Sequence, residues 1–212
     1  MKHTLILYPL CAAFLCFTFT SCNQSGNKKL AGDSPAETSS EASAEQPETK
    51  LESTPELVAL LQQAALDGDL MGVEKAIGSG VDVNGMDEEG RTALMFAGFN
   101  GHSEIVLKLL DAESGIDHRD KMGRTALLYA ATGPFPETVR ILLDKGAEPN
   151  VVDSDEHFSP LMHAAAEGNL DVVKILMEAG SDATLKDIDG DNAASFAKQS
   201  GHIEVANYLE AL

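Results

Sequence analysis

The stretch RTALMFAGFNGHSEIVLKLL at residues 91–110 returns in altered form as RTALLYAATGPFPETVRILL at 124–143 and as FSPLMHAAAEGNLDVVKILM at 158–177. A fourth copy, DNAASFAKQSGHIEVANYLE, begins at residue 191, so successive copies start 33 or 34 residues apart. Running the register back one step finds Ala64 and Gly68 at the matching places of a first unit. A fixed period of this length predicts a stack of repeats in which each unit contacts only its neighbours.

Each unit contains the local pattern of two short helices. Thr92, Thr125 and Ser159 stand where a first helix begins, and their side chains can accept hydrogen bonds from the exposed backbone N–H groups. Small residues let this helix pack closely, and an aliphatic stripe at i, i+3 and i+4 supplies the buried face of the second helix. These positions are Ala97, Ala130, Ala164 and Ala197 for the small residues, and Val106, Leu109 and Leu110 for the stripe of the second unit.

Thr92-Ala93-Leu94 and its copies resemble the T-P-L-H-x-A start of ankyrin repeats, whose period is 33 residues. The likeness covers about residues 55–212. It implies an all-α repeat fold, an ankyrin solenoid of about five helix–turn–helix units whose β-turn fingers and inner helices form a concave surface. The predicted units are about 55–87, 88–120, 121–153, 154–187 and 188–212.

Several positions depart from the pattern of the ankyrin family. Its histidine is replaced by Met95, Leu128, Met162 and Ser195, which predicts apolar packing in three of the four units. The sequence Gly133-Pro134-Phe135-Pro136 requires a rebuilt turn between the helices of the third unit. Glu113 stands where a helix-ending Gly is expected, and one inserted residue lengthens the finger at 153–158. The first and last units are expected to cap the stack.

Residues 1–21, MKHTLILYPLCAAFLCFTFTS, have the charge, length and order of regions of a secretory signal peptide. Pro9 and the short apolar run make a retained membrane anchor the weaker interpretation. Phe19-Thr20-Ser21-Cys22 resembles the lipobox of bacterial lipoproteins, which implies cleavage before Cys22 and acylation of its thiol. An ordinary secretory peptide is the alternative. The resemblance also implies the outer membrane, facing the periplasm, because Asn23 stands where Asp would signal retention in the inner membrane; surface display is the alternative.

Residues 22–54 are rich in Ser, Glu, Ala, Pro and Thr and show no hydrophobic periodicity. Such a segment buries too little apolar surface to offset its ordering entropy, so we expect a disordered tether after the acylated Cys. A phosphorylated or partner-binding segment is the alternative.

Composition excludes several classes of function. The chain has 15 Lys+Arg against 34 Asp+Glu, a net charge of −19, and this acidity disfavours nucleic acid as a partner. All three Cys lie within the first 22 residues, so the repeat domain has no thiol for zinc ribbons, iron–sulfur sites or thiol catalysis. The repeat domain has 11 basic and 28 acidic residues, and it therefore contains most of the negative charge.

No motif predicts a catalytic residue, a metal or a cofactor. The carboxylates of Asp187, Asp189 and Asp191 have the spacing of a calcium loop, but Asn192 and Lys198 occupy positions where Gly and Glu are required. We therefore interpret this segment as a finger turn. His102 and His202 are expected in turns between helices, and His163 is expected to be a satisfied core or half-buried histidine.

The resemblance places partner binding on the fingertips and on the exposed ends of the inner helices. Four apolar candidates, Phe99, Met122, Phe158 and Ile188, are the strongest, although some of them could instead fold back onto the stack. The polar candidates that complete the surface are Glu88, Glu89, Arg91, Asn100, Lys121, Arg124, Thr132, Asp155, Glu156, His157, Glu167, Asp189, Asp191 and Gln199.

These features predict a cell-envelope lipoprotein, anchored in the membrane through Cys22, whose repeat domain binds another protein as scaffold or adaptor. The acidic surface favours a partner with a basic surface. An immunity-type inhibitor of a basic toxin or cell-wall hydrolase is the alternative. A hydrolase is a third hypothesis; it predicts a closed pocket with clustered titratable groups, whereas we expect no enzymatic activity.

Overall fold

The computed structural model describes residues 54–212. The predicted signal peptide, the predicted acylation at Cys22 and nearly all of the predicted tether lie outside the described residues. Within residues 54–212 the chain forms ten α-helices in five pairs and no strand. The helices are α1 Pro55–Asp67, α2 Leu70–Gly78, α3 Ala93–Phe99, α4 Ser103–Asp111, α5 Ala126–Ala131, α6 Pro136–Asp144, α7 Pro160–Ala166, α8 Leu170–Glu178, α9 Ala193–Gln199 and α10 Ile203–Glu210.

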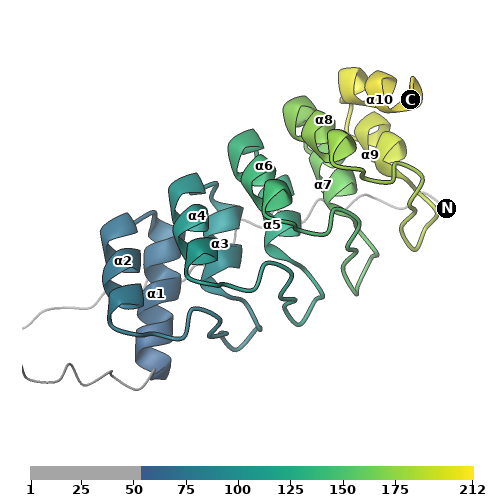
Figure 1. The fold of residues 1–212 in the computed structure, drawn as a ribbon. Helices are drawn as coiled ribbons and strands as arrows, with labels where there is room; N and C mark the ends of the chain where they lie inside the picture. The colour runs from purple at the N-terminus through teal and green to yellow at the C-terminus, as the bar shows by residue number, and fades with distance from the viewer. Residues whose placement is uncertain (1–53) are drawn as a thin grey trace, which may run out of the picture. The chain divides into compact units, whose positions relative to one another are not determined.

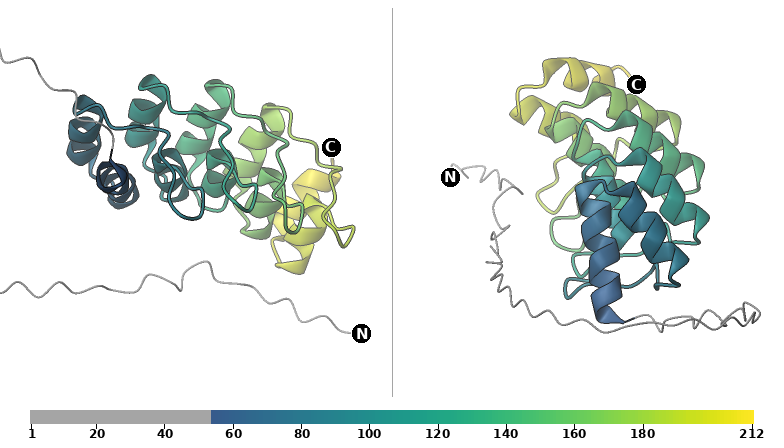
Figure 2. Two further views of the ribbon diagram at one scale, coloured as in Figure 1. Left: turned by 90° about the horizontal axis from the view of Figure 1, so that it is seen from below. Right: turned by 90° about the vertical axis from the view of Figure 1, so that its left-hand side faces the viewer.

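The five helix pairs stack side by side, which confirms the predicted all-α repeat fold (Figure 1). The odd-numbered helices form an inner layer in which each contacts the next, and the even-numbered helices form an outer layer. The loops between pairs project along one edge of the stack as fingers (Figure 2). None of the helices in the described range is both long and apolar enough to cross a membrane.

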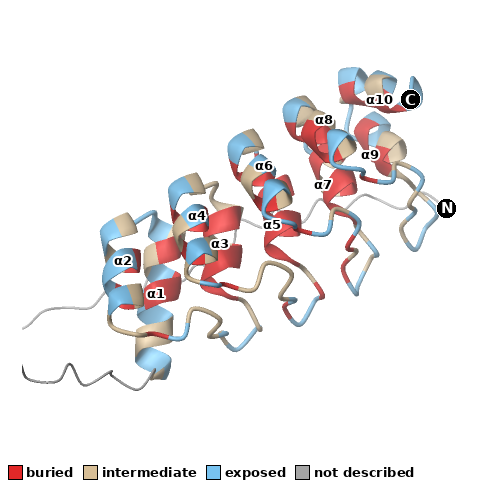
Figure 3. Ribbon diagram, viewed as in Figure 1, coloured by how far each residue is buried: buried red, intermediate tan, exposed pale blue. Residues whose placement is uncertain are grey.

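The core lies between the two layers and between neighbouring pairs, where Figure 3 shows the buried residues. Ala97, Ala130, Ala164 and Ala197 are completely buried, as expected for positions where inner helices approach closely. The aliphatic residues of the outer helices are buried against them, including Val106, Val139 and Val173. Small side chains at these contacts bring the helix axes close together and favour dense packing.

The predicted N-caps are confirmed in part. The hydroxyl of Thr125 accepts from Leu128 N at 3.3 Å, and the hydroxyl of Ser159 accepts from Met162 N at 3.3 Å. Thr92 is the N-cap residue of α3 as expected and takes part in a capping box with Met95, but its buried Oγ1 lacks a hydrogen bond like those of Thr125 and Ser159. The backbone N–H of Thr92 donates to the thioether of Met95 at 3.5 Å. Met95 thus supplies an acceptor where the ankyrin family has His.

The third unit has a rebuilt turn, as its Pro residues predict. Pro136 occupies the first turn of α6, where its missing N–H costs nothing, and Phe135 is the N-cap residue. The Phe135 ring lies over Gly101 of the second unit, and a Cβ there would come within 2.3 Å of it. Gly101 also has a φ of 69°, so both the backbone and the neighbouring ring require glycine.

Two non-glycine residues adopt the left-handed backbone conformation. Glu113 has a φ of 64° at the end of the second unit, in the place where Gly80, Gly146 and Gly180 end other units. His157 has a φ of 62° in the finger that contains the inserted residue. An L-residue with a Cβ is disfavoured in this region, so both positions store local strain.

The first unit has no finger, and the start of α1 occupies that place instead. α1 is 13 residues long, and Val58 in its first turns lies against Gly85, which directly precedes the first finger. Gln62 donates to the carbonyls of Gly85 and Arg91 at 3.1 and 3.0 Å. α1 therefore packs against the first finger and covers that end of the row of fingers.

Candidate binding surface on the fingers and inner helices

Four fingers, at residues 86–91, 119–124, 152–158 and 186–191, share one turn organised by an aspartate. Oδ1 of Asp87, Asp120, Asp153 and Asp187 accepts two backbone N–H groups of its own finger. We refer to the first two as the early fingers and to the last two as the late fingers. This turn explains the spacing of the carboxylates at 187–191, because Asp187 receives the N–H groups of Asp189 and Asp191.

Backbone hydrogen bonds join neighbouring fingertips into one row. Lys121 N donates to Glu89 O at 2.9 Å, Ser154 N to Met122 O at 2.7 Å, and Ile188 N to Glu156 O at 3.2 Å. The tips are therefore held at fixed spacing by the main chain. A main chain that is already ordered lowers the entropic cost of fixing these loops in a complex.

The early fingers use their arginines within the chain. Arg91 Nε donates to Asp87 Oδ2 at 2.8 Å, and its guanidinium lies 4.9 Å from the centre of the Phe96 ring. Arg124 repeats this arrangement with Asp120, at 3.1 Å, and with the ring of Tyr129, at 5.0 Å. Each arginine therefore links the finger of its unit to the inner helix.

Asp120 is the most buried of the finger aspartates that form ion pairs, with 1% of its side chain exposed. Tyr129 donates to Asp120 Oδ2 at 2.7 Å. Burial is the main cause that raises the pKa of the Tyr129 phenol, and this hydrogen bond is the second. The hydroxyl therefore remains a donor in neutral solution. The finger at 119–124 therefore contains a closed network of one carboxylate, one guanidinium and one phenol.

The late fingers contain different side chains at the arginine position. Phe158 replaces it in the fourth unit, where its ring makes edge contacts with His163 and Phe196 at 5.4 and 4.9 Å. Asp191 replaces it in the fifth unit. Neither Asp153 nor Asp187 forms a salt bridge within residues 54–212. The late fingers therefore retain carboxylates that no cation of the described chain neutralises.

His163 differs from the expected satisfied histidine. It is half-buried, but its Nε2 is buried without a hydrogen-bond partner. Desolvation lowers the pKa of His163 to about 4; Asp153 opposes this shift and Arg124 adds to it. The expected half-burial is confirmed, but the expected hydrogen bonding is wrong for Nε2. The neighbour that packs against the ring is the apolar Phe158, in an edge contact at 5.4 Å.

The four apolar candidates fall into two groups. Met122 and Ile188 are exposed at the fingertips, with 39% and 57% of their surface accessible. Phe99 and Phe158 are half-buried against the core, and Phe99 meets the ring of Tyr129 at 6.1 Å. Met86, at 50% exposure, is a third exposed apolar fingertip that sequence analysis missed.

The polar candidates also separate by position. Those exposed at the fingertips lie along the row that the backbone bonds define, whereas Asn100 and Thr132 use their side chains to bind the carbonyls of Leu66 and Tyr129 at 2.7 Å. Exposed positions include Glu88, Glu89, Lys121, Asp155, His157, Glu167, Asp189 and Gln199; half-buried positions include Arg91, Asn100, Arg124, Thr132, Glu156 and Asp191.

Sequence analysis also missed a row of rings on the inner helices. Phe96, Tyr129, His163 and Phe196 follow one another at steps of 33 or 34 residues. Each lies under the finger of its own unit or the preceding one, as the contacts of Arg91, Arg124 and Phe158 show. The repeat register contained this information, because the four residues occupy the same position of each unit.

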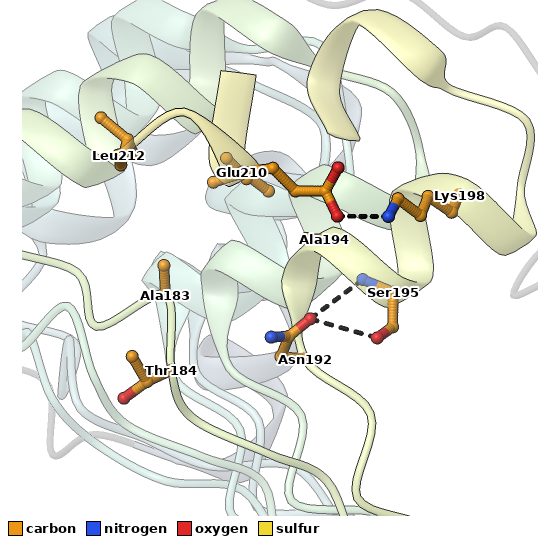
Figure 4. A pocket seen from close by; sticks show the side chains of 9 residues that line it. Ala183, Thr184, Asn192, Ala194, Ser195, Lys198, Glu210 and Leu212 are labelled. Carbon is orange, nitrogen blue, oxygen red and sulfur yellow. Dashed lines mark hydrogen bonds and ion pairs between the residues drawn. The ribbon is translucent and has the colours of Figure 1, made fainter. Parts of the chain in front are cut away.

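The open C-terminal end of the stack contains a shallow pocket (Figure 4). Ala194 and Ser195 line it, where the preceding inner helices have the larger pairs Leu94-Met95, Leu127-Leu128 and Leu161-Met162. The titratable groups at this pocket are Lys198 and Glu210, which form an ion pair with each other. Among the described residues, no group of three or more His, Cys, Asp or Glu side chains is arranged to hold a metal ion.

Comparison with known proteins identifies the repeat. The family described as Ankyrin repeats (3 copies) matches residues 61–153 and 136–211. The chain is 34% identical over 149 residues to the ankyrin repeat and KH domain-containing protein mask-1 of Caenorhabditis elegans, a match that covers 70% of this chain and 4% of that protein.

Two further similar proteins are named as inhibitors of cyclin-dependent kinases. Over 71 residues the chain is 39% identical to the human cyclin-dependent kinase inhibitor 2A and 38% identical to the rat cyclin-dependent kinase 4 inhibitor B. Each match covers 34% of this chain, and 46% and 55% of those proteins. The chain thus spans about half the length of these inhibitors and a small part of mask-1.

Proposed function

The chain belongs to the ankyrin repeat family, and we propose that it is a cell-envelope lipoprotein whose repeat domain binds another protein as scaffold or adaptor. The observation that supports binding most directly is the row of fingertips held together by backbone hydrogen bonds. This row presents the exposed side chains of Met122 and Ile188 among charged groups. An apolar centre with a polar rim is the usual composition of a protein interface.

The proposed partner has a basic surface. The late fingers support this, because their carboxylates lack cations in the described part of the chain. Opposite charge on the partner would increase the association rate and make it sensitive to salt. No catalytic residue is assigned in this proposal.

Affinity capture with the full chain tests the binding surface. We expect Met122→Ser together with Ile188→Ser to reduce recovery of partners from an envelope extract. The matched control is Met71→Ser with Ile203→Ser, because both side chains are exposed on outer helices, away from the fingers. Equal recovery by the finger variant and the control would contradict this assignment.

The envelope part of the proposal depends on the lipobox-like residues Phe19 to Cys22. Two or more acyl chains at Cys22 would make a stable anchor, since each buried methylene contributes about 0.8 kcal/mol. Labelled palmitate should enter the chain and should be lost in Cys22→Ser but retained in Cys16→Ser. Labelling that survives the loss of Cys22 would exclude the lipoprotein assignment.

Inhibition is the second candidate function, in the form of an immunity-type protein that blocks a basic toxin or a cell-wall hydrolase. Two of the similar proteins are named as inhibitors of kinases, which shows that similar repeat sequences occur in inhibitors. Addition of equimolar chain to a captured enzyme distinguishes the two functions. Loss of the enzyme's activity would support inhibition, and unchanged activity would support a scaffold.

A further inference from the structure

The early fingers provide an internal template for the recognition of arginine. In both, Oδ1 of the finger aspartate accepts backbone N–H groups, while Oδ2 accepts the Nε of an arginine from the same finger. The two ion pairs measure 2.8 and 3.1 Å. The turn therefore leaves one carboxylate oxygen available, in a fixed orientation, for a guanidinium group.

The last finger, at residues 186–191, keeps this aspartate but has no arginine. Oδ1 of Asp187 accepts the N–H groups of Asp189 and Asp191 at 3.0 and 2.7 Å. Its Oδ2 receives no hydrogen bond or ion pair from the described residues. Asp191 stands at the arginine position and adds a second carboxylate, whose Oδ2 accepts from Gln199 at 3.0 Å. The last finger therefore has the acceptor of the template without its cation.

The early and late fingers also differ in their balance of charge. The early fingers contain four acidic and four basic residues, whereas the late fingers contain six acidic residues and a single basic one, Lys186. Ile188 adds an exposed apolar side chain at the tip of the last finger. This combination complements a partner side chain that has both a long aliphatic stem and a positive end.

We propose that the last finger binds an arginine side chain of the protein partner, with its guanidinium paired to Asp187 and Asp191 and its stem against Ile188. The inference rests on the proposed protein-binding function and names the chemical group that this finger recognises. Phe158 already contacts Phe196, so the guanidinium is placed on the carboxylates and not on that ring. Arginine is favoured over lysine because its planar guanidinium can engage two carboxylate oxygens at once.

Fluorescent octa-arginine and octa-lysine peptides serve as probes of the full chain, with binding followed by anisotropy at about 0.15 M salt. We expect octa-arginine to bind about fivefold more tightly than octa-lysine. Asp187→Asn with Asp191→Asn should weaken octa-arginine binding about tenfold. The amide oxygen of asparagine can still accept the backbone N–H groups, so this pair removes charge while keeping the turn.

The matched control is Asp144→Asn with Glu148→Gln, because these exposed acids lie away from the fingertips and form no ion pair. We expect the control to bind octa-arginine within about twofold of the parent chain. Equal affinity for the two peptides would overturn the proposal. An equal loss in the two charge variants would also overturn it, since it would show attraction to net charge alone.

Asp191→Arg tests the template directly. It restores the arginine of the early fingers, so it should remove octa-arginine binding and leave the thermal unfolding midpoint no lower than that of the parent. Persistent binding in Asp191→Arg would overturn the proposal. Affinity capture separates this inference from the proposed function. If the recovery of partners falls when Met122 is replaced but not when Asp187 and Asp191 are replaced, the arginine site is rejected and the proposed binding function stands.

Discussion

The early and late fingers share one backbone turn but differ in what their side chains contact. In the early fingers Arg91 and Arg124 join the finger aspartate to a ring of the inner helix. In the late fingers Phe158 and Asp191 stand in the place of these arginines, and the aspartates have no salt bridge in the described range. One scaffold therefore uses charge for internal stability in one half and leaves it available to a partner in the other.

The difference shows that equal position in a repeat does not imply an equal role. The turn geometry needs only the Oδ1 atom of each aspartate. The Oδ2 atom can have a different function in each finger, because the backbone hydrogen bonds of the turn all go to Oδ1. Ankyrin units can therefore keep their fold while the fingertip chemistry changes from one unit to the next.

The largest expected effect is the loss of Asp120. Asp120→Ala removes the acceptor for two backbone N–H groups, a guanidinium and the Tyr129 phenol. We expect the free energy of unfolding to fall by about 3 kcal/mol, against about 1 kcal/mol for Asp187→Ala, whose aspartate accepts only backbone groups. Urea denaturation of both variants measures this. Equal losses would show that the early network adds nothing beyond the turn.

Replacing His163 should make the stability of the repeat domain less sensitive to acid. The folded pKa of about 4 lies below the ordinary value of 6.5, so the unfolded chain takes up the proton first as the pH falls. Stability is therefore lost between about pH 6.5 and pH 4, by about 2 kcal/mol on going from pH 7 to pH 5. His163→Phe, which copies Phe96 and Phe196, should remove this loss. Parallel pH–stability curves for the parent and the variant would contradict this assignment.

Arg91→Ala should destabilise the early fingers moderately. It removes an ion pair with Asp87 that is partly exposed and a cation–π contact with Phe96. We expect a loss of about 1 kcal/mol in urea denaturation. The control is Arg119→Ala, an exposed arginine of the next early finger, which should change stability by less than about 0.5 kcal/mol. A comparable loss in the control would remove the distinction between structural and surface arginines.

The smallest expected effect concerns Glu113, at the end of the second unit. Glu113→Gly relieves the strain of its left-handed backbone but increases the entropy of the unfolded chain. The two terms nearly offset each other, so we expect a gain of about 0.5 kcal/mol. Thermal unfolding measures it, with Glu104→Gly in α4 as the destabilised control. A loss at position 113 would show that the side chain of Glu113 stabilises the join between the units.

Much of the fold followed from residues that repeat at a fixed period. Ala97 and its copies predict close helix packing, and all four are completely buried. Pro136 predicts a rebuilt turn, and it begins α6. The contacts of the candidate site were less predictable. Phe99 and Phe158 have the same apolar character as Met122 and Ile188, yet the first two lie against the core and the last two are exposed. Periodicity does not report which way a loop side chain turns.

The sequence by itself determined the repeat architecture, the positions where helices begin, and the absence of thiols from residues 23–212. These properties depend on residues within one unit, and four or five copies reinforce the same pattern. Only the tertiary structure decided that Asp120 is enclosed while Oδ2 of Asp187 has no partner among the described residues, and that the half-buried ring of His163 meets the edge of Phe158. The physical reason is that burial and charge pairing arise where side chains of neighbouring units and fingers meet in space, after the backbone has brought them together.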